Sequence, residues 1–290
     1  MEKSSERPLV SIIIPAYNAA RYIKETLDSA LAQTYPNIEV IVIDNASTDT
    51  TREVLKPYIE KGAIMYFHLS ENKAASGARN VGIKNAHGEF VAFLDSDDIF
   101  SPTKIEHQIE YLLDHPDCGV CYCGIWHFYD TDPGTLLTLG YEYYSGNEVF
   151  PHIIRKNFIN PLSVVMRKSV IDRVGVFDEH YRKVEDWEYW IRLARHGVFF
   201  SFLPEPLGKY RMRKAGLWYS LEVRRENKQI VVDMFKELKK KMSSAERKKY
   251  HMNYIILDNT IKLRYIQLES IFPLLGTIYE WLQKSRLSRT

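Results

Sequence analysis

The run Val10-Ser11-Ile12-Ile13-Ile14-Pro15 decides the fold of this 290-residue chain. It is short, rich in β-branched residues and followed by a proline, which is typical of a strand buried on both faces of a parallel sheet. Similar runs alternate with helical patterns over the first hundred residues. This alternation predicts an α/β fold, with a mostly parallel sheet flanked by helices. Further strands are predicted at 38–43, 63–69 and 90–94, and helices at 20–33, 47–58 and 73–86.

The pattern changes after Asp117, where strands no longer alternate regularly with helices. Beyond Leu217 it is helical nearly to the end, with basic and apolar residues interleaved. These changes predict one domain at 1–216, with halves 1–116 and 117–216, and a helical C-terminal extension at 217–290. Strands are predicted at 119–129, 135–139, 162–166, 199–203 and 207–212, and helices at 148–156 and 186–196.

Composition excludes several classes of protein. The 39 Lys and Arg nearly balance the 37 Asp and Glu, and neither sign forms a block, which argues against a nucleic-acid partner. Cys118, Cys121 and Cys123 are an odd number in a long chain, which is typical of a reducing compartment. Strand alternation favours core thiols over a zinc site. The polar start, Met1 to Pro8, and the lack of a long apolar run predict a cytoplasmic protein.

Acidic residues follow the predicted strands, at the edge of the sheet where ligands of parallel sheets bind. The strongest such feature is Asp95-Ser96-Asp97-Asp98. Three carboxylates within four residues repel one another unless a cation or solvent compensates them. Hard oxygen ligands of this kind suit magnesium or manganese. The alternative is a solvated turn before the helix that begins at Pro102.

Asp44 and Arg79 are further candidates for a nucleotide site. Asp44 ends the second strand, where its carboxylate can accept a hydrogen bond from an imide such as uracil N3–H, or can cap the next turn. Arg79 lies between Gly77 and Gly82, so its helix can approach the sheet and the arginine can reach a base or phosphate. A solvated arginine is the alternative. No glycine-rich phosphate loop follows any strand, so the sequence supports neither a Rossmann dehydrogenase nor a P-loop kinase.

Two adjacent acids, Glu185 and Asp186, precede an amphipathic helix. Acids at a helix N-terminus are stabilised by the helix dipole. A general base that takes a proton from an acceptor hydroxyl is equally compatible with this position. The residues by themselves leave both interpretations open.

Five motifs in order resemble the family 2 glycosyltransferases with the GT-A fold. The resemblance extends from Val10 to about Arg213, roughly the first 70% of the chain. It implies an inverting, metal-dependent transferase that moves a sugar from a nucleotide diphosphate, UDP by preference, to a glycan or lipid-linked glycan in cell-surface polysaccharide or glycolipid biosynthesis. The motifs are Ser11 to Asn18, Val42 to Asp49, Asn72 to Gly82, Leu94 to Asp98 and Glu185 to Glu188.

The resemblance implies a role for each candidate residue. Asp186 is similar to the catalytic base, and Asp97 and Asp98 are similar to the acids that hold Mn²⁺ or Mg²⁺. Asn45 and Arg213 depart from the family pattern, since a second acid is common at the first position and a metal-binding histidine at the second. Arg213 can instead hold the diphosphate. The implied donor-nucleotide contacts are Pro15, Ala16, Tyr17, Asp44, Arg79, Asp95 and Arg213.

The sequence lacks the features expected of two other classes of protein. A nucleotidyltransferase that forms the sugar nucleotide would carry a glycine-rich loop after the first strand, and the sequence has Pro15 to Arg21 there. A non-catalytic nucleotide-binding module would be expected to have lost the acidic loop or Asp186, and both are present.

The C-terminal helices, with Ile271 to Leu275 and Trp281, either pack on the domain or lie on the inner face of the cell membrane.

Overall fold

The computed structural model describes residues 7–138, 143–212, 221–253, 255–256, 258–260 and 262. The chain divides into two compact units, Met1–Arg213 and Lys214–Thr290.

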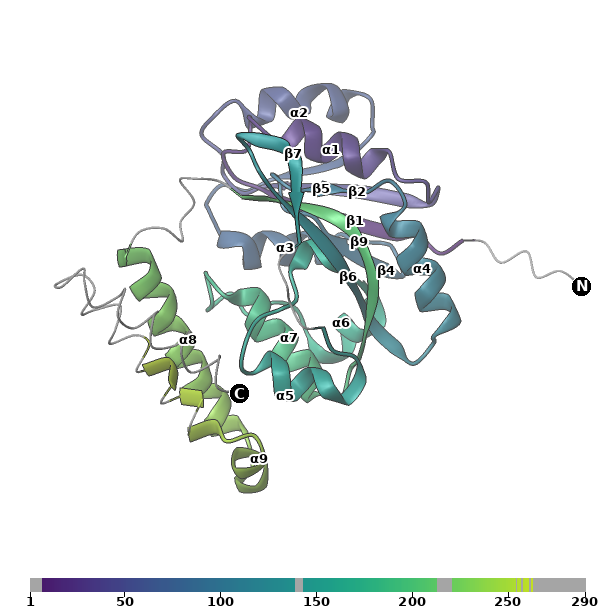
Figure 1. Cartoon of the computed structure of the whole chain (residues 1–290). Helices are drawn as coiled ribbons and strands as arrows, with labels where there is room; N and C mark the ends of the chain where they lie inside the picture. The colour runs from purple at the N-terminus through teal and green to yellow at the C-terminus, as the bar shows by residue number, and fades with distance from the viewer. Residues whose placement is uncertain are drawn as a thin grey trace, which may run out of the picture. The chain divides into compact units, whose positions relative to one another are not determined.

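Four parallel strands form the predicted half of the sheet in the first unit (Figure 1). Their order, β3-β2-β1-β4, reverses direction between β1 and β4. Ligands of open parallel sheets bind at such a switch point, beyond the carboxyl ends of the strands. The strands are β1 (Val10–Ala16), β2 (Ile38–Asp44), β3 (Met65–His68) and β4 (Phe90–Phe93), joined in turn by α1 (Ile23–Leu31), α2 (Thr51–Glu60) and α3 (Ala74–Lys84).

Alternate residues of β1 face the two helical layers. Ile12 and Ile14 belong to a core cluster with apolar residues of α1, α2 and α4 (Lys104–Asp114). On the other face, a Cβ added to Gly82 of α3 would lie 2.4 Å from Ile13 Cγ2. Glycine is therefore required at 82 for α3 to lie this close to β1, and the approach brings Arg79 to the edge of the sheet.

Beyond β4 the sheet is mixed: β8 pairs antiparallel with β4 and β6, and β5 pairs antiparallel with β9, whereas β6 and β9 are parallel. The order β4-β8-β6-β9-β5 completes the path, with β7 paired to β6. The prediction of two short strands at 199–203 and 207–212 is wrong, because β9 is continuous. Pro204 lies where the register of β9 against β6 shifts, and a residue without an N–H is tolerated at such a bulge. The elements are β5 (Ile99–Phe100), β6 (Cys118–Tyr129), β7 (Asp132–Leu137), β8 (Val164–Arg167), β9 (Phe199–Met212), α5 (Val149–Ile153), α6 (Lys168–Val174) and α7 (Glu185–Arg195).

The positions of the cysteines and the helices of the second unit match the predictions made from the sequence. Cys118, Cys121 and Cys123 are buried free thiols, as expected for core residues. In the second unit, α8 (Leu221–Lys241) and α9 (Ser244–Lys249) confirm the helical pattern over the described part of the tail. No helix of the described residues is long and apolar enough to cross a bilayer. Residues 271–275 and Trp281 lie outside the described residues.

Candidate active site

Asparagine side chains tie together the loops that follow β1, β2 and β3. Asn18 Oδ1 accepts hydrogen bonds from the backbone of the β2 loop, with Thr48 N at 2.8 Å. Asn45 Nδ2 donates to Asn72 Oδ1 at 3.2 Å and to Ala74 O at 3.0 Å in the β3 loop. These bonds give Asn45 a structural role. They fix the loops at the carboxyl edge of the sheet relative to one another.

Asp44 is a hydrogen-bonded carboxylate at the end of β2. Its oxygens accept hydrogen bonds from Ser47 N at 2.9 Å and from the Tyr66 hydroxyl at 2.8 Å, and His68 Nδ1 lies 3.3 Å away. Burial raises its pKa, but the hydrogen bonds from Ser47, Tyr66 and His68 outweigh burial, so the pKa lies below its usual range. Asp44 is therefore an anion that can accept a further donor such as an imide.

The end of β1 lies beside Asp44 in the sheet. Pro15 and Ala16 pair with Ile43 and Asp44 in the parallel register. Tyr17 follows directly, and 49% of its surface is exposed. The predicted base-pocket residues are thus adjacent, with an aromatic ring available to a ligand.

Arg79 lies in the interior between two carboxylates. Its Nη2 donates to Asp95 Oδ1 at 2.6 Å, and its Nη1 donates to Glu185 Oε1 at 2.7 Å. The guanidinium also lies 5.5 Å from the centre of the Phe177 ring. Burial lowers its pKa, but Asp95 and Glu185 more than compensate and raise it. Arg79 therefore joins the acidic loop after β4 to the start of α7.

The acidic loop has one interior and two accessible carboxylates. Asp95 and Asp97 are partly exposed, whereas Asp98 is 1% exposed and accepts a hydrogen bond from Arg211 N at 2.9 Å. Burial and the neighbouring Asp97 and Asp95 raise the pKa of Asp98. Arg211 Nε also donates to the Asp97 carbonyl at 2.8 Å, which fixes the loop against β9. Arg213 lies outside the described residues.

The acidic loop does not form a complete metal cage. Among the described residues, no group of three or more His, Cys, Asp or Glu side chains is arranged to hold an ion. Magnesium and manganese are commonly held by one or two carboxylates together with water and substrate phosphates. Asp97, an accessible carboxylate on a fixed loop with Asp98 beside it, fits such a shared site.

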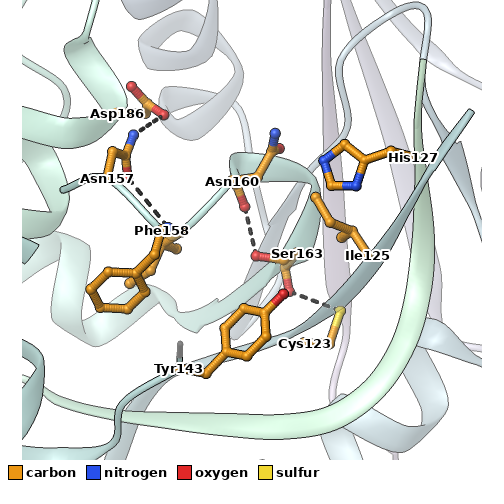
Figure 2. Close-up of a pocket in the computed structure, with 10 residues that line it drawn as sticks. Cys123, Ile125, His127, Tyr143, Asn157, Phe158, Asn160, Ser163 and Asp186 are labelled. Carbon is orange, nitrogen blue, oxygen red and sulfur yellow. Dashed lines mark hydrogen bonds between the residues drawn. The ribbon is translucent and has the colours of Figure 1, made fainter. Parts of the chain in front are cut away.

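Asp186 lines a pocket of about 120 Å³ (Figure 2). Its Oδ2 accepts a hydrogen bond from Asn157 Nδ2 at 2.9 Å, and its Oδ1 accepts one from Trp187 N at 2.8 Å. Burial and the adjacent Glu185 raise the pKa of Asp186 to about 7, against the opposing effects of Arg79, Asn157 and Trp187. A carboxyl group with this pKa exchanges a proton readily near neutral pH.

Sequence reasoning missed several residues of this site. Tyr66 and His68 lie two apart on β3 and so share a face, but the register that brings them to Asp44 is not visible in the sequence. Asn157 and Asn160 lie in an irregular segment without periodicity, so the sequence held no signal for them. The ion pair of Glu185 with Arg79 joins residues 106 positions apart.

The comparisons with known proteins show the class. The family model for glycosyl transferase family 2 matches residues 11–174. An uncharacterized glycosyltransferase of Rickettsia typhi is 37% identical over 223 residues, 74% of this chain and 67% of that protein. TuaG of Bacillus subtilis, named for teichuronic acid biosynthesis, is 32% identical over 208 residues, 71% of this chain and 80% of TuaG. This chain belongs to glycosyl transferase family 2, so its class is that of the glycosyltransferases.

Solved structures confirm the GT-A-type fold. A mannosyltransferase of Pyrobaculum calidifontis, solved with GDP-Man and Mn²⁺, superposes with a TM-score of 0.67 at 20% identity, over 99% of this chain and 82% of that chain. S. aureus TarS with UDP-GlcNAc gives 0.65 at 23% identity, over 87% and 71%. Among the sequence relatives, an uncharacterized glycosyltransferase of Rickettsia felis is 38% identical over 200 residues. This chain spans only 32% of the length of that protein.

Replacement of Arg79 is expected to destabilise the first unit strongly. Arg79→Met leaves Asp95 and Glu185 without their shared cation, and breaking a buried pair in this way costs about 3–5 kcal/mol. Arg79→Lys keeps the charge but cannot bridge both carboxylates, so an intermediate loss is expected. Urea unfolding measures both variants. Lys56→Met, which breaks an exposed helical pair with Glu60, is the control and leaves the midpoint unchanged. If the urea midpoint of Arg79→Met equalled that of the wild type, the stabilising role of these ion pairs would be contradicted.

Proposed function

We propose that this protein is an inverting glycosyltransferase that moves a sugar from a nucleotide-diphosphate donor, a UDP-sugar, to an acceptor hydroxyl in cell-surface polysaccharide or glycolipid biosynthesis. The observation that carries the proposal is Asp186, a carboxylate in a small pocket with a pKa near neutrality. It is linked through Glu185 and Arg79 to Asp95 at the switch point of the sheet.

The reaction is a single displacement in which Asp186 is the base. The Asp186 carboxylate takes the proton of an acceptor hydroxyl while that oxygen attacks the anomeric carbon of the donor. The bond from that carbon to the diphosphate oxygen breaks, and the nucleoside diphosphate leaves with the electron pair. The proton ends on Asp186, and the configuration of the sugar is inverted. Family membership supports this chemistry for the chain.

The donor site is proposed at the carboxyl edge of the parallel strands. Pro15, Ala16 and Tyr17 would shape the base pocket, and Asp44 would accept the uracil N3–H. Asp95 would contact the ribose and Arg213 the diphosphate. Two structural neighbours were solved with UDP-GlcNAc or GDP-Man, which supports a nucleotide-sugar donor here. Because both ends of the Arg79 guanidinium are engaged by acids, Arg79 would act on the nucleotide through Asp95.

The divalent cation is proposed at Asp97, with Asp98 as the second acid. The interior position of Asp98, held by Arg211 N, favours Asp97 as the residue in direct contact. A bound Mn²⁺ or Mg²⁺ would neutralise charge on the diphosphate. The Mn²⁺ complex of one neighbour supports this choice of metal.

Calorimetric titration of UDP tests the donor site. UDP is expected to bind in the presence of Mn²⁺ and to lose at least tenfold in affinity with EDTA. Asp97→Asn should remove this dependence on metal, and Asp114→Asn, at the exposed end of α4, is the control. Absence of UDP binding with metal present would refute the uridine assignment of Asp44 and leave another nucleotide or a non-catalytic module. Release of diphosphate from sugar 1-phosphate and UTP would instead identify a nucleotidyltransferase.

The pH dependence of transfer tests Asp186. Asp186→Asn should abolish transfer and leave UDP affinity near normal. In the wild type, kcat/KM should fall below a pH of about 7, where Asp186 becomes protonated. Asn157→Ala removes a hydrogen bond to the carboxylate, so the pKa rises and the acidic limb moves up by about one pH unit. Asn37→Ala, at the amino edge of the sheet, is the control. Unchanged turnover of Asp186→Asn would remove Asp186 from the mechanism.

The C-terminal unit is proposed to contact an anionic membrane surface. Seven Lys or Arg and only two Glu lie between Lys236 and Tyr250, and most of the basic residues are exposed. A capping box of Ser243 and Glu246 fixes the turn between α8 and α9, so the basic ends of both helices have a defined geometry. Clusters of four to eight basic residues on amphipathic helices bind anionic lipids.

Vesicle co-sedimentation tests the membrane contact. The full chain is expected to bind phosphatidylglycerol vesicles and to remain unbound with phosphatidylcholine. Glutamine at 240, 241, 248 and 249 should weaken binding about a hundredfold or more. Glutamine in place of four exposed lysines of the first unit, Lys24, Lys56, Lys61 and Lys84, is the control. Equal binding of both vesicle types, or of both variants, would contradict the proposal.

A further inference from the structure

The pocket beside Asp186 is nearly free of ionised groups. Of its ten lining residues, Asp186 is the single carboxylate, and neither Lys nor Arg is among them. His127 is the one lining side chain that could become a cation. Burial lowers the pKa of His127, so its ring stays neutral at physiological pH. The described lining therefore contains one anionic group, Asp186, and no cationic side chain to neutralise a second anion.

Among the described residues, the cations Arg79 and Lys104 interact with lining side chains, and both are hydrogen-bonded elsewhere. Arg79, which lowers the pKa of Asp186, donates to Asp95 and to Glu185. Lys104 interacts electrostatically with Cys123, but it is completely buried and donates to Gln108 Oε1 at 2.5 Å. Neither side chain is available to a group inside the pocket.

Neutral hydrogen-bonding and aromatic groups form most of the remaining lining (Figure 2). Asn160 Oδ1 accepts a hydrogen bond from Leu162 N at 2.8 Å, which fixes the amide. No described residue accepts a hydrogen bond from Asn160 Nδ2, so this group can donate to a ligand oxygen. Tyr143 and Phe158 add aromatic surface. Amide donors beside aromatic rings match the hydroxyl groups and C–H faces of a sugar ring.

The pocket is also small. Its volume of about 120 Å³ is below the roughly 300 Å³ at which sites for drug-sized ligands begin. A pocket of this size can enclose a single sugar ring but not a whole oligosaccharide.

We propose that this pocket receives an uncharged, polyhydroxylated ring, a neutral sugar residue, and discriminates against a ring that carries a carboxylate or phosphate. The inference rests on the proposed function, because it takes the pocket as the acceptor side of the base. An acidic ring next to Asp186 would bring two anions together in a desolvated site. It would also hold Asp186 in its protonated state, which cannot act as a base. The same desolvated surroundings that raise the pKa of Asp186 therefore also disfavour an acidic ring beside it.

A matched pair of ring probes tests the proposal on the full chain. Methyl β-D-glucopyranoside and methyl β-D-galactopyranoside are the neutral probes, and their 6-carboxylate counterparts are the acidic ones. Binding is measured by saturation-transfer NMR at pH 8, with UDP and Mn²⁺ present. At least one neutral ring should bind at least tenfold more tightly than its acidic counterpart, and Asp186→Asn should reduce this ratio. Equal or tighter binding of the acidic rings, or no binding of either neutral ring, would overturn the proposal.

A variant of Asn160 tests the same site. Asn160→Asp keeps an oxygen to accept from Leu162 N but replaces the Nδ2 donor with an anion. Binding of the neutral ring should weaken at least tenfold at an unchanged unfolding midpoint, and unaltered binding would count against the proposal. Asn37→Asp makes the same exchange at the amino edge of the sheet and should change nothing. Because these measurements need no turnover, failure of UDP to bind would refute the donor assignment alone, whereas preference for acidic rings would refute this inference alone.

Discussion

The geometry of the site depends on one buried cation held between two acids. Arg79 reaches Asp95 on the loop after β4 and Glu185 at the start of α7, so elements from both halves of the first unit meet on a single guanidinium. Charges in the interior are stable only when they are paired and hydrogen-bonded. The arginine and the two acids therefore require one another, and the distance between the acidic loop and Asp186 is fixed as a result. The close approach of α3 to β1 at Gly82 is what makes this arrangement sterically accessible.

Two carboxylates of this site show how hydrogen-bond partners and neighbouring charges decide the chemical role of an acid. Asp44 and Asp186 are both penalised by burial, yet their pKa values move in opposite directions. Asp44 has the Tyr66 hydroxyl, His68 and the Ser47 backbone around it, which keep it ionised. Asp186 has one amide from Asn157 and one backbone N–H, with the like charge of Glu185 adjacent. The first environment makes an acceptor that keeps its charge, and the second makes a group that can gain and lose a proton.

The strands and the edge of the sheet were predictable because they depend on local pattern. β-Branched runs identified β1 and β2, and the rule for parallel sheets brought Asp44 and the acidic loop to one edge. The predictions failed where neighbours along the sheet decide the outcome. The continuity of β9 depends on its register with β6, which accommodates Pro204 in a bulge. The direction of a buried side chain such as Arg79 depends on partners far away in sequence, so its position between Asp95 and Glu185 was not visible in the sequence.

Backbone strain at the site has a physical explanation in the same ion pair. Val184, the residue before Glu185, has a φ of 58°, a left-handed conformation that is a genuine outlier for a β-branched residue. Such strain costs about 1–3 kcal/mol and persists only where the surroundings impose it. Glu185 is anchored to Arg79, and Asp186 is anchored to Asn157, so the chain before them must turn sharply to enter α7. The strained backbone thus directs two adjacent acids to different surroundings: Glu185 to Arg79, and Asp186 into the pocket.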